Sequence, residues 1–259
     1  MSSFRVGIVG CGSIGSHIAN SLCDLGINQL MLIDNDILSF ENVARHLCGG
    51  MYVGKKKVDA INDYLSSRLP HSKHTSYHGE ILSILRNNET FLNRCDLTIV
   101  ATAHLPTEFR LDELHRCGII ESPILYVWVE PYLAGAHAVY INSKNPGQFR
   151  DLFDENHKFK FNILKNSGQY SIREAGCQST YVPYSVIEVK RFISELIYFI
   201  QRGILNGDND ENILFTWFGD VSLQHSNERE IDERWNGIHN YSVIKTRVTS
   251  YTQVEAKQV

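Results

Sequence analysis

The sequence predicts an α/β fold in which helices flank a mostly parallel sheet, extended by antiparallel strands and a long crossing loop. Two observations carry this prediction. Strand and helix signals alternate through the first half of the chain, as a parallel sheet with crossover helices requires. A glycine-rich loop also joins the first strand to the first helix. Strands are expected near 4–9, 28–34, 74–78, 96–101 and 123–130, and helices near 13–25, 55–68, 81–88 and 107–117.

Proline and glycine residues set several of these bounds. Pro70 ends the helix expected over 55–68, because proline disfavours the helical conformation in the residue before it. Residues 135–141 alternate between the two faces in the manner of a strand. Only a tight glycine turn separates them from the preceding strand, so we expect the two strands to be antiparallel.

The second half of the chain has weaker patterns. Residues 142–182 are polar and weakly periodic, which indicates a long crossing loop, and such loops inside compact domains are more often functional than idle. Residues 185–201 carry apolar side chains at helical spacing, and Gly203 is expected to end that helix. Residues 213–218 and 241–248 are interpreted as late strands.

Composition argues against several classes of protein. The chain has 259 residues and a net charge of −4, so no surface-wide attraction to nucleic acid is expected. No apolar run approaches the roughly 18 residues of a membrane-spanning helix, and the N-terminus leads into a strand instead of a signal peptide. The six cysteines include no Cys-x-x-Cys pair, which argues against a disulfide scaffold and a thiolate zinc site. We therefore expect a cytoplasmic protein with no nucleic-acid or membrane partner.

The glycine loop predicts a phosphate-binding site. The first strand leads into Gly10-Cys11-Gly12-Ser13-Ile14-Gly15. Glycines let the backbone turn tightly and approach an anion, and the N-terminus of the following helix directs N–H groups at it. Taken alone, this Rossmann-like loop favours NAD or FAD, with Asp34 at the end of the second strand holding the ribose hydroxyls.

Residues downstream of the second strand favour ATP instead. They are Asp36, Asn42, Arg45 and Lys57. A dinucleotide keeps its pyrophosphate intact and gains little from cations there, whereas a nucleotide whose phosphate bond breaks needs them. We expect Arg45 to clamp the β- and γ-phosphates with its planar guanidinium and Lys57 to offer charge to the α-phosphate. The alternatives are a surface salt bridge at Arg45 and a solvated helix start over Lys55–Lys57.

The order and spacing of these residues resemble the ubiquitin-activating-like adenylyltransferase family (ThiF/MoeB/HesA). In that family the glycine loop is followed by Asp-x-Asp, Asn-x-x-Arg and a lysine shortly after a glycine. The resemblance covers roughly residues 4–141. It implies ATP-dependent adenylation of the C-terminal carboxylate of a small ubiquitin-like or sulfur-carrier protein. The ATP site that it implies comprises Gly10, Gly12, Ile14, Gly15, Asp34, Asp36, Asn42, Arg45 and Lys57.

Later motifs are similar to adenylation domains of bacterial ubiquitin-like conjugation operons, some of which occur in antiphage systems. These motifs are Trp128-Val129-Glu130-Pro131-Tyr132, Gly135-Ala136-His137-Ala138, Gly176-Cys177 and Pro183-Tyr184-Ser185. The resemblance implies one adenylation domain over 1–259, with a nucleotide-binding core (1–141), the crossing loop (142–182) and a C-terminal part (183–259). It further implies a separate conjugating enzyme, since no conjugating domain is fused here, and by analogy of fold a homodimer.

One departure from the family concerns magnesium. After the fourth strand the family usually has Asp-Asn, the aspartate helping to bind Mg²⁺, whereas this sequence has Ala103-His104. We expect the ATP phosphates and Asp36 to hold Mg²⁺, because Arg45 and Lys57 are retained. The alternative is a weakened ATP step.

Cys177 is the candidate nucleophile. It lies on the crossing loop, close in sequence to Arg173 and before a long helix, where a thiol can be exposed and electropositive enough to react as a thiolate. The resemblance implies that Cys177 takes the modifier from its adenylate as a thioester. A packed loop cysteine is the alternative. Buried and inert thiols are expected at Cys11, Cys23 and Cys95.

The histidines give weaker signals. His71, His74 and His78 are close in sequence but straddle a turn and a strand, which does not favour a metal site. Glu130 and His137 flank the tight glycine turn, where a buried, hydrogen-bonded histidine is at least as good an interpretation as a functional one.

Two rival functions stay open. An NAD(P)-dependent oxidoreductase would bind a dinucleotide tightly, without Mg²⁺ and without need of Arg45. A non-catalytic scaffold, in the form of a degenerate adenylation fold, would bind ATP weakly with or without Mg²⁺. The Ala103-His104 pair is the feature that favours the scaffold.

Overall fold

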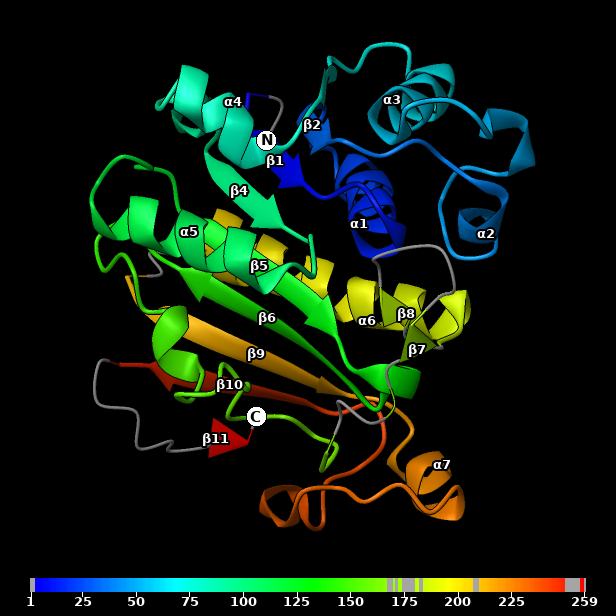
Figure 1. Cartoon of the computed structure of the whole chain (residues 1–259), viewed down its shortest axis with the longest axis vertical. Helices are drawn as coiled ribbons and strands as arrows, with labels where there is room; N and C mark the ends of the chain where they lie inside the picture. The colour runs from blue at the N-terminus through cyan, green and yellow to red at the C-terminus, as the bar shows by residue number, and fades with distance from the viewer. Residues whose placement is uncertain are drawn as a thin grey trace.

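A computed structural model describes residues 3–166, 170, 172–173, 180–181, 184–206, 210–249 and 257–258. Its strands form a nine-stranded sheet in the order β11-β10-β9-β6-β5-β4-β1-β2-β3, and a separate ribbon of β7 and β8. Figure 1 shows the large sheet running through the molecule with helices on both of its faces. No helix within the ranges given above is long and apolar enough to cross a membrane.

One half of the sheet is parallel and positions the site. It comprises β1 (Arg5–Val9), β2 (Gln29–Asp34), β3 (Thr75–His78), β4 (Leu97–Val100) and β5 (Ile124–Val129). All five strands lie inside their expected ranges, and the prediction of a Rossmann-like sheet is confirmed. The strand order reverses between β1 and β4, and open α/β sheets bind ligands at that kind of switch point.

The other half is antiparallel. It comprises β6 (Gly135–Ile141), β9 (Asn212–Phe218), β10 (Val243–Val248) and β11 (Lys257–Gln258). The antiparallel pairing of β6 with β5 is as predicted. The late strand expected from residue 241 begins only at Val243. Tyr241 has a left-handed φ of 61°, which no strand residue adopts, and its hydroxyl donates to Asp220.

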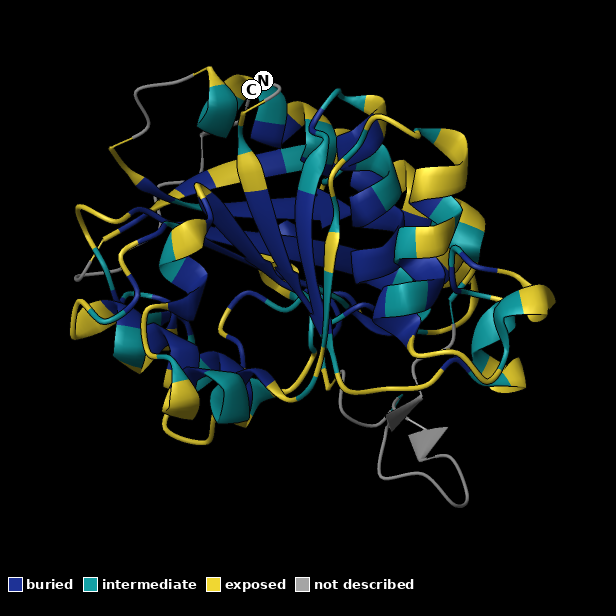
Figure 2. Ribbon diagram, turned by 90° about the horizontal axis from the view of Figure 1, so that it is seen from above, coloured by how far each residue is buried: buried dark blue, intermediate teal, exposed yellow. Residues whose placement is uncertain are grey.

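Helices pack on both faces because the strand side chains alternate. Leu30 and Leu32 face α1 (Ser13–Asp24), α3 (Lys57–Arg68) and α6 (Val186–Phe199) in one apolar cluster. Met31 and Ile33 face the other cluster, with α4 (Ile81–Asn87) and α5 (Leu105–Arg116). Figure 2 shows the sheet buried between these layers, with exposed residues on the outward sides of the helices.

Three helix bounds differ from the expectation. The helix expected from residue 55 begins at Lys57, because Lys56 is extended and bridges to Ile37. The helix expected from 107 begins at Leu105, with Pro106 in its first turn, where a missing N–H costs nothing. Gly203 does not end the long helix as predicted, since α6 passes into a π-helical turn over Ile200–Leu205.

Some elements had no sequence signal. They are the short helices α2 (Phe40–Val43) and α7 (Val221–Ser226), the 3₁₀ turn Arg150–Leu152, and the strands β7 (Ile172–Arg173) and β8 (Thr180–Tyr181). The crossing loop is also less polar than its composition indicates. Phe149 is fully buried and stacks on Tyr126 with ring centroids 3.9 Å apart. The first part of the loop therefore belongs to the core.

Candidate nucleotide site

A cavity of about 430 Å³ opens at the carboxyl ends of β1, β2 and β4. Its lining includes Gly10, Gly12, Asp34, Asp36, Lys57 and His104. This is the end of the sheet, and the switch point, at which parallel α/β folds bind ligands. The fold therefore places the predicted glycine loop and the predicted acidic and basic residues around one hollow.

The glycine loop needs glycine at two positions and is open at the third. Gly10 has a φ of +90°, and a side-chain carbon there would lie 2.6 Å from the carbonyl oxygen of Ala101. A side-chain carbon at Gly15 would collide with the carbonyl oxygen of Gly10. Gly12 precedes the first residue of α1, and a carbon added to it would meet no atom within 4 Å. The helix N-terminus at Gly12 thus fits a phosphate group.

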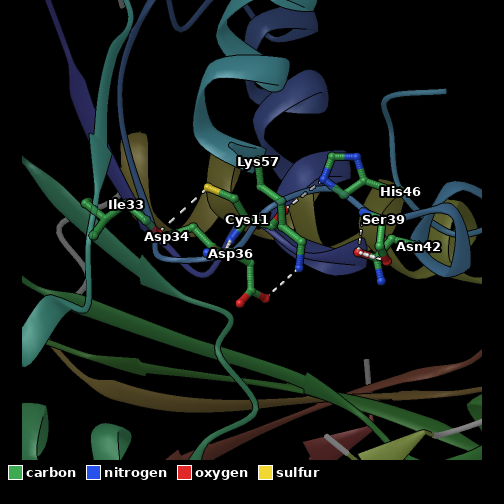
Figure 3. A network of polar contacts seen from close by, with 8 residues as sticks. All are labelled: Cys11, Ile33, Asp34, Asp36, Ser39, Asn42, His46 and Lys57. Carbon is green, nitrogen blue, oxygen red and sulfur yellow. Dashed lines mark hydrogen bonds and ion pairs between the residues drawn. The ribbon is translucent and has the colours of Figure 1, made fainter. Parts of the chain in front are cut away.

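Asp34 supports the loop from the end of β2. One of its carboxylate oxygens accepts the N–H of Cys11 at 2.5 Å, and the other accepts the N–H of Asp36 at 2.7 Å (Figure 3). The side chain is half-buried and lines the cavity. Because each carboxylate oxygen has two acceptor positions, capacity for ribose hydroxyls is left after these two bonds.

Lys57 reaches the cavity from the first residue of α3. Its Nζ lies 2.7 Å from Oδ2 of Asp36, and its side chain is only 10% exposed against 59% for Asp36. The alternative of a solvated helix start is therefore wrong for Lys57, although Lys55, two residues earlier, is 51% exposed. The Lys57 ammonium is nearly buried and its one carboxylate partner is exposed. It can therefore bind a further anion, such as a phosphate, in place of the Asp36 carboxylate or in addition to it.

Asn42 and Arg45 do not line this cavity. The Asn42 side chain accepts from the N–H and the hydroxyl of Ser39 and so caps α2. The Arg45 guanidinium lies 5.6 Å from the centre of the Tyr184 ring, just before α6. The structure thus brings Lys57 to the cavity with Gly10, Gly12, Asp34 and Asp36. Arg45 is half-buried beside Tyr184, outside the cavity lining. Ile14 and Gly15 are buried residues of α1, and Gly15 packs against the carbonyl oxygen of Gly10.

The turn after β4 forms the far wall of the cavity. Ala103 adopts a left-handed φ of 50°. Two short contacts hold this turn: the Thr102 hydroxyl donates to Glu108 at 2.8 Å, and Nδ1 of His104 lies 2.8 Å from the Thr107 hydroxyl. Burial raises the pKa of Glu108 to about 7, although Thr102 and two backbone N–H groups oppose that shift.

The parent protein is expected to lose stability as pH rises through the range in which Glu108 ionises, and Glu108→Gln is expected not to. The pKa of Glu108 is about 7 when folded and 4.5 as an unperturbed group. Between these values the unfolded chain gives up the proton while the folded chain keeps it, so the free energy of unfolding falls as pH rises, by about 3 kcal/mol in total. Urea denaturation of both proteins at about pH 5 and about pH 8 measures the difference. Equal pH dependence in the two proteins would contradict the assignment.

The cavity fits Mg²⁺ in combination with phosphate oxygens. Within the described ranges, no group of three His, Cys, Asp or Glu side chains could hold a metal ion. Mg²⁺ is usually bound by one or two carboxylates, waters and the phosphates of a substrate. Asp36, exposed at the cavity, fits the single carboxylate of such a site.

The candidate nucleophile Cys177 lies outside the described residues. Cys11, Cys23 and Cys95 are buried, and burial raises the pKa of Cys23 and Cys95 to about 12 and raises that of Cys11 well above its usual value. The prediction that these three thiols are buried is confirmed, and a raised pKa leaves little of the reactive thiolate form. Cys48 is also buried, whereas Cys117 is exposed at the end of α5.

Glu130, directly after β5, and His137, in β6, form a buried pair. Nε2 of His137 lies 2.7 Å from Oε1 of Glu130, and both side chains are at most 2% exposed. The Glu130 carboxylate also accepts the N–H groups of Ile163 and Leu164. The pair fastens the crossing loop to β6, which agrees with a buried, hydrogen-bonded histidine.

Sequence reasoning missed the residues that hold the site together. His46 and His17 both bond to backbone carbonyls of this region, at Cys11 and Arg45. Thr102 and Glu108 shape the far wall. The available signal was the position of His17 and Ser13 on one face of α1, four residues apart.

Comparison with known proteins agrees with this geometry. The sequence model of the ThiF family matches residues 1–175. The chain is 33% identical to adenylyltransferase and sulfurtransferase uba4 of Aspergillus niger over 44% of this chain and 23% of that protein. It is 35% identical to ATP-dependent ubiquitin transferase-like protein Cap2 of Enterobacter hormaechei over 29% of this chain and 12% of that protein. The matches thus span less than a quarter of either relative.

Among solved structures, the fold is similar to that of MccB of Escherichia coli in a crystal structure with a succinimide. The TM-score is 0.57, with 18% identity over 97% of this chain and 66% of that chain. At this identity the likeness establishes the shared fold.

Proposed function

This chain belongs to the ThiF family, and we propose that it catalyses ATP-dependent adenylation of the C-terminal carboxylate of a small ubiquitin-like or sulfur-carrier protein. The observation that carries the proposal is the cavity in which the open helix N-terminus at Gly12 faces the same hollow as the nearly buried Lys57. Two independent sources of positive potential at one switch point suit a polyphosphate. The names of uba4 and Cap2 support the same chemistry.

The proposed step is a displacement at the α-phosphorus of ATP. A carboxylate oxygen of the carrier attacks and forms a bond to the α-phosphorus, which gives the acyl adenylate. The bond from the α-phosphorus to the oxygen of the β-phosphate breaks, and pyrophosphate leaves with the electron pair. Lys57 neutralises charge at the α-phosphate, and Asp34 accepts from the ribose hydroxyls. Arg45, which lies beside Tyr184 in this structure, binds the β- and γ-phosphates with its planar guanidinium.

Magnesium is proposed as the metal of this reaction. Asp36 would hold it together with phosphate oxygens, and the ion would neutralise part of the charge on the leaving pyrophosphate. Lys57 would then exchange its contact with Asp36 for one with the nucleotide. This arrangement does without the aspartate that Ala103 replaces.

We further propose that Cys177 captures the activated carrier as a thioester and passes it to a separate conjugating enzyme. The thiolate attacks the acyl carbon of the adenylate, and AMP leaves. A homodimer is the proposed assembly. Phe40 and Met51, which are 75% and 84% exposed on the segment between β2 and α3, are apolar side chains that a second copy would cover.

Rival functions fit the site less well. Tyr140 and Lys144 have the Tyr-x-x-x-Lys spacing of a hydride-transfer pair. However, Tyr140 is buried in β6 and Lys144 pairs with Asp210 at 2.5 Å, and neither lines the cavity. A scaffold would have no use for a buried lysine in an open phosphate cavity.

Exchange of labelled pyrophosphate into ATP tests the proposal. We expect exchange to require the chain, Mg²⁺ and a small carrier protein that ends in glycine. The same carrier with its terminal carboxylate amidated is the matched control and should give none. Exchange without carrier, or equal exchange with the amidated carrier, would contradict carboxylate adenylation. Weak ATP binding, with and without Mg²⁺, together with no exchange would favour the scaffold.

The same reaction mixture tests the thioester. A carrier adduct that is released by thiol reagents is expected with the parent protein and not with Cys177→Ala, while both proteins give equal pyrophosphate exchange. An adduct that forms at the parental rate in Cys177→Ala would remove this second step and leave adenylation standing.

A further inference from the structure

His46 connects the segment around Arg45 to the glycine loop. Its Nε2 lies 2.9 Å from the carbonyl oxygen of Cys11, and its Nδ1 accepts the N–H of Cys48 at 3.0 Å. The side chain is 6% exposed. Figure 3 shows the imidazole reaching across from its own loop to Cys11.

These two contacts fix the protonation of the ring. Because the N–H of Cys48 can only donate, Nδ1 must be the acceptor nitrogen, and the single proton of a neutral imidazole is on Nε2. That proton is donated to the carbonyl of Cys11. Burial lowers the pKa of His46 to about 4, so the ring stays neutral at physiological pH.

The Arg45 segment is fastened to α1 at the same time. Ser13, Ser16 and His17 share one face of the helix, three and four residues apart. The Ser13 hydroxyl donates to the carbonyl of Arg45 at 3.0 Å, and Nε2 of His17 lies 3.2 Å from the same oxygen. The Ser16 hydroxyl accepts the N–H of Leu47 at 3.2 Å. His46 therefore acts on Cys11 from a backbone that is itself held in place.

The carbonyl of Cys11 and the N–H of Gly12 belong to one planar peptide. In a trans peptide the C=O and N–H bonds point in opposite directions, so a group that holds one sets the direction of the other. Asp34 holds the preceding N–H, that of Cys11, at 2.5 Å. With His46 on the carbonyl, the N–H of Gly12 is turned away from His46, and Gly12 lines the cavity.

We propose that His46 is a positioning residue of the nucleotide site: by holding the carbonyl of Cys11 it aims the N–H of Gly12 at a phosphate of the bound nucleotide. This inference rests on the proposed function, because it takes the ligand to carry phosphates. It assigns to His46 a role in affinity for the phosphates and none in binding adenosine itself.

Two matched substitutions distinguish the roles of the two ring nitrogens of His46. In His46→Gln the amide nitrogen reaches the place of Nε2 and still donates to Cys11. In His46→Asn the amide oxygen takes the place of Nδ1 and still accepts from Cys48, but the side chain is too short to reach Cys11. Both variants lose the imidazole, so a packing role would affect them alike.

Calorimetric titration with ATP and with adenosine is the measurement. We expect the Kd for ATP to rise about tenfold in His46→Asn, the equivalent of one lost hydrogen bond, and to stay near the parental value in His46→Gln. The Kd for adenosine should be the same in all three proteins. Equal ATP affinity in His46→Asn and the parent, equal losses in both variants, or a parallel loss for adenosine would overturn the proposal.

Failure of the proposed function gives a different result, since the parent protein would then bind ATP weakly or not at all. If His46→Asn does not fold, nuclear magnetic resonance of the parent decides the question. The histidine ¹⁵N spectrum should show His46 protonated on Nε2, and the Gly12 amide proton should shift on addition of ATP but not of adenosine. A Gly12 amide that ATP leaves unchanged would overturn the proposal.

Discussion

Lys57→Ala is expected to lower carrier-dependent pyrophosphate exchange by about 100- to 1,000-fold, the usual effect of removing one preorganised donor to a developing charge. Lys57 is held for this purpose: its side chain is 10% exposed, and its Nζ lies at the cavity beside Asp36. Its partner is exposed, so little stability should be lost with the pair. The exchange rate at saturating ATP measures the effect.

Lys55→Ala is the matched control for that experiment. Lys55 lies two residues earlier, but its Nζ pairs with Asp63 at 2.9 Å and the side chain is 51% exposed. The variant removes the same charge from the same stretch of sequence without touching the cavity, and exchange should be unchanged. Equal rates for Lys57→Ala and the parent would contradict the role of Lys57 in the reaction. Equal losses in the two variants would show that net charge and not the position of Lys57 matters.

Asp34→Ala is expected to raise the Kd for ATP by about 100-fold, or about 3 kcal/mol. The substitution leaves the N–H groups of Cys11 and Asp36 without their acceptor, which loosens the glycine loop, and it removes the acceptor for the ribose. Equilibrium titration with ATP measures the change.

Asp63→Ala provides the comparison for Asp34. Asp63 is 54% exposed and pairs with Lys55 away from the cavity, so the Kd for ATP should be parental. In Asp34→Asn the amide keeps one acceptor oxygen, and its Kd is expected to fall between those of the parent and Asp34→Ala. ATP affinity that does not depend on residue 34 would contradict the assignment of the nucleotide to this cavity.

The parallel half of the fold could be predicted because its signals are local. Strands such as β2 are short apolar runs bounded by turn residues, and the glycine loop marks the transition from β1 to α1. The side chains at the cavity follow directly, since Gly10, Gly12 and Asp34 are at the ends of those strands. Their placement needs only the topology of a parallel sheet.

What depends on contacts between distant segments could not be predicted. The contact of the Arg45 guanidinium with the ring of Tyr184, far along the chain, has no signal in the sequence. Phe149 lies in a segment whose composition predicts a polar loop, but its ring is buried against that of Tyr126 in β5. His46 gives no periodic signal, because its role comes from the carbonyl of Cys11, 35 residues earlier. In each case the place of the side chain is determined by a contact with a residue far away in the sequence, and not by the local sequence pattern.

The most direct test of the account is a crystal structure of the protein with ATP and Mg²⁺. We predict the triphosphate in the cavity between β1 and β4, with the Gly12 N–H and the Lys57 ammonium on phosphate oxygens and the Arg45 guanidinium turned from Tyr184 to the β- and γ-phosphates. A nucleotide bound elsewhere, or bound there with Lys57 and Arg45 both directed at solvent, would contradict the claim that this cavity is built to activate ATP.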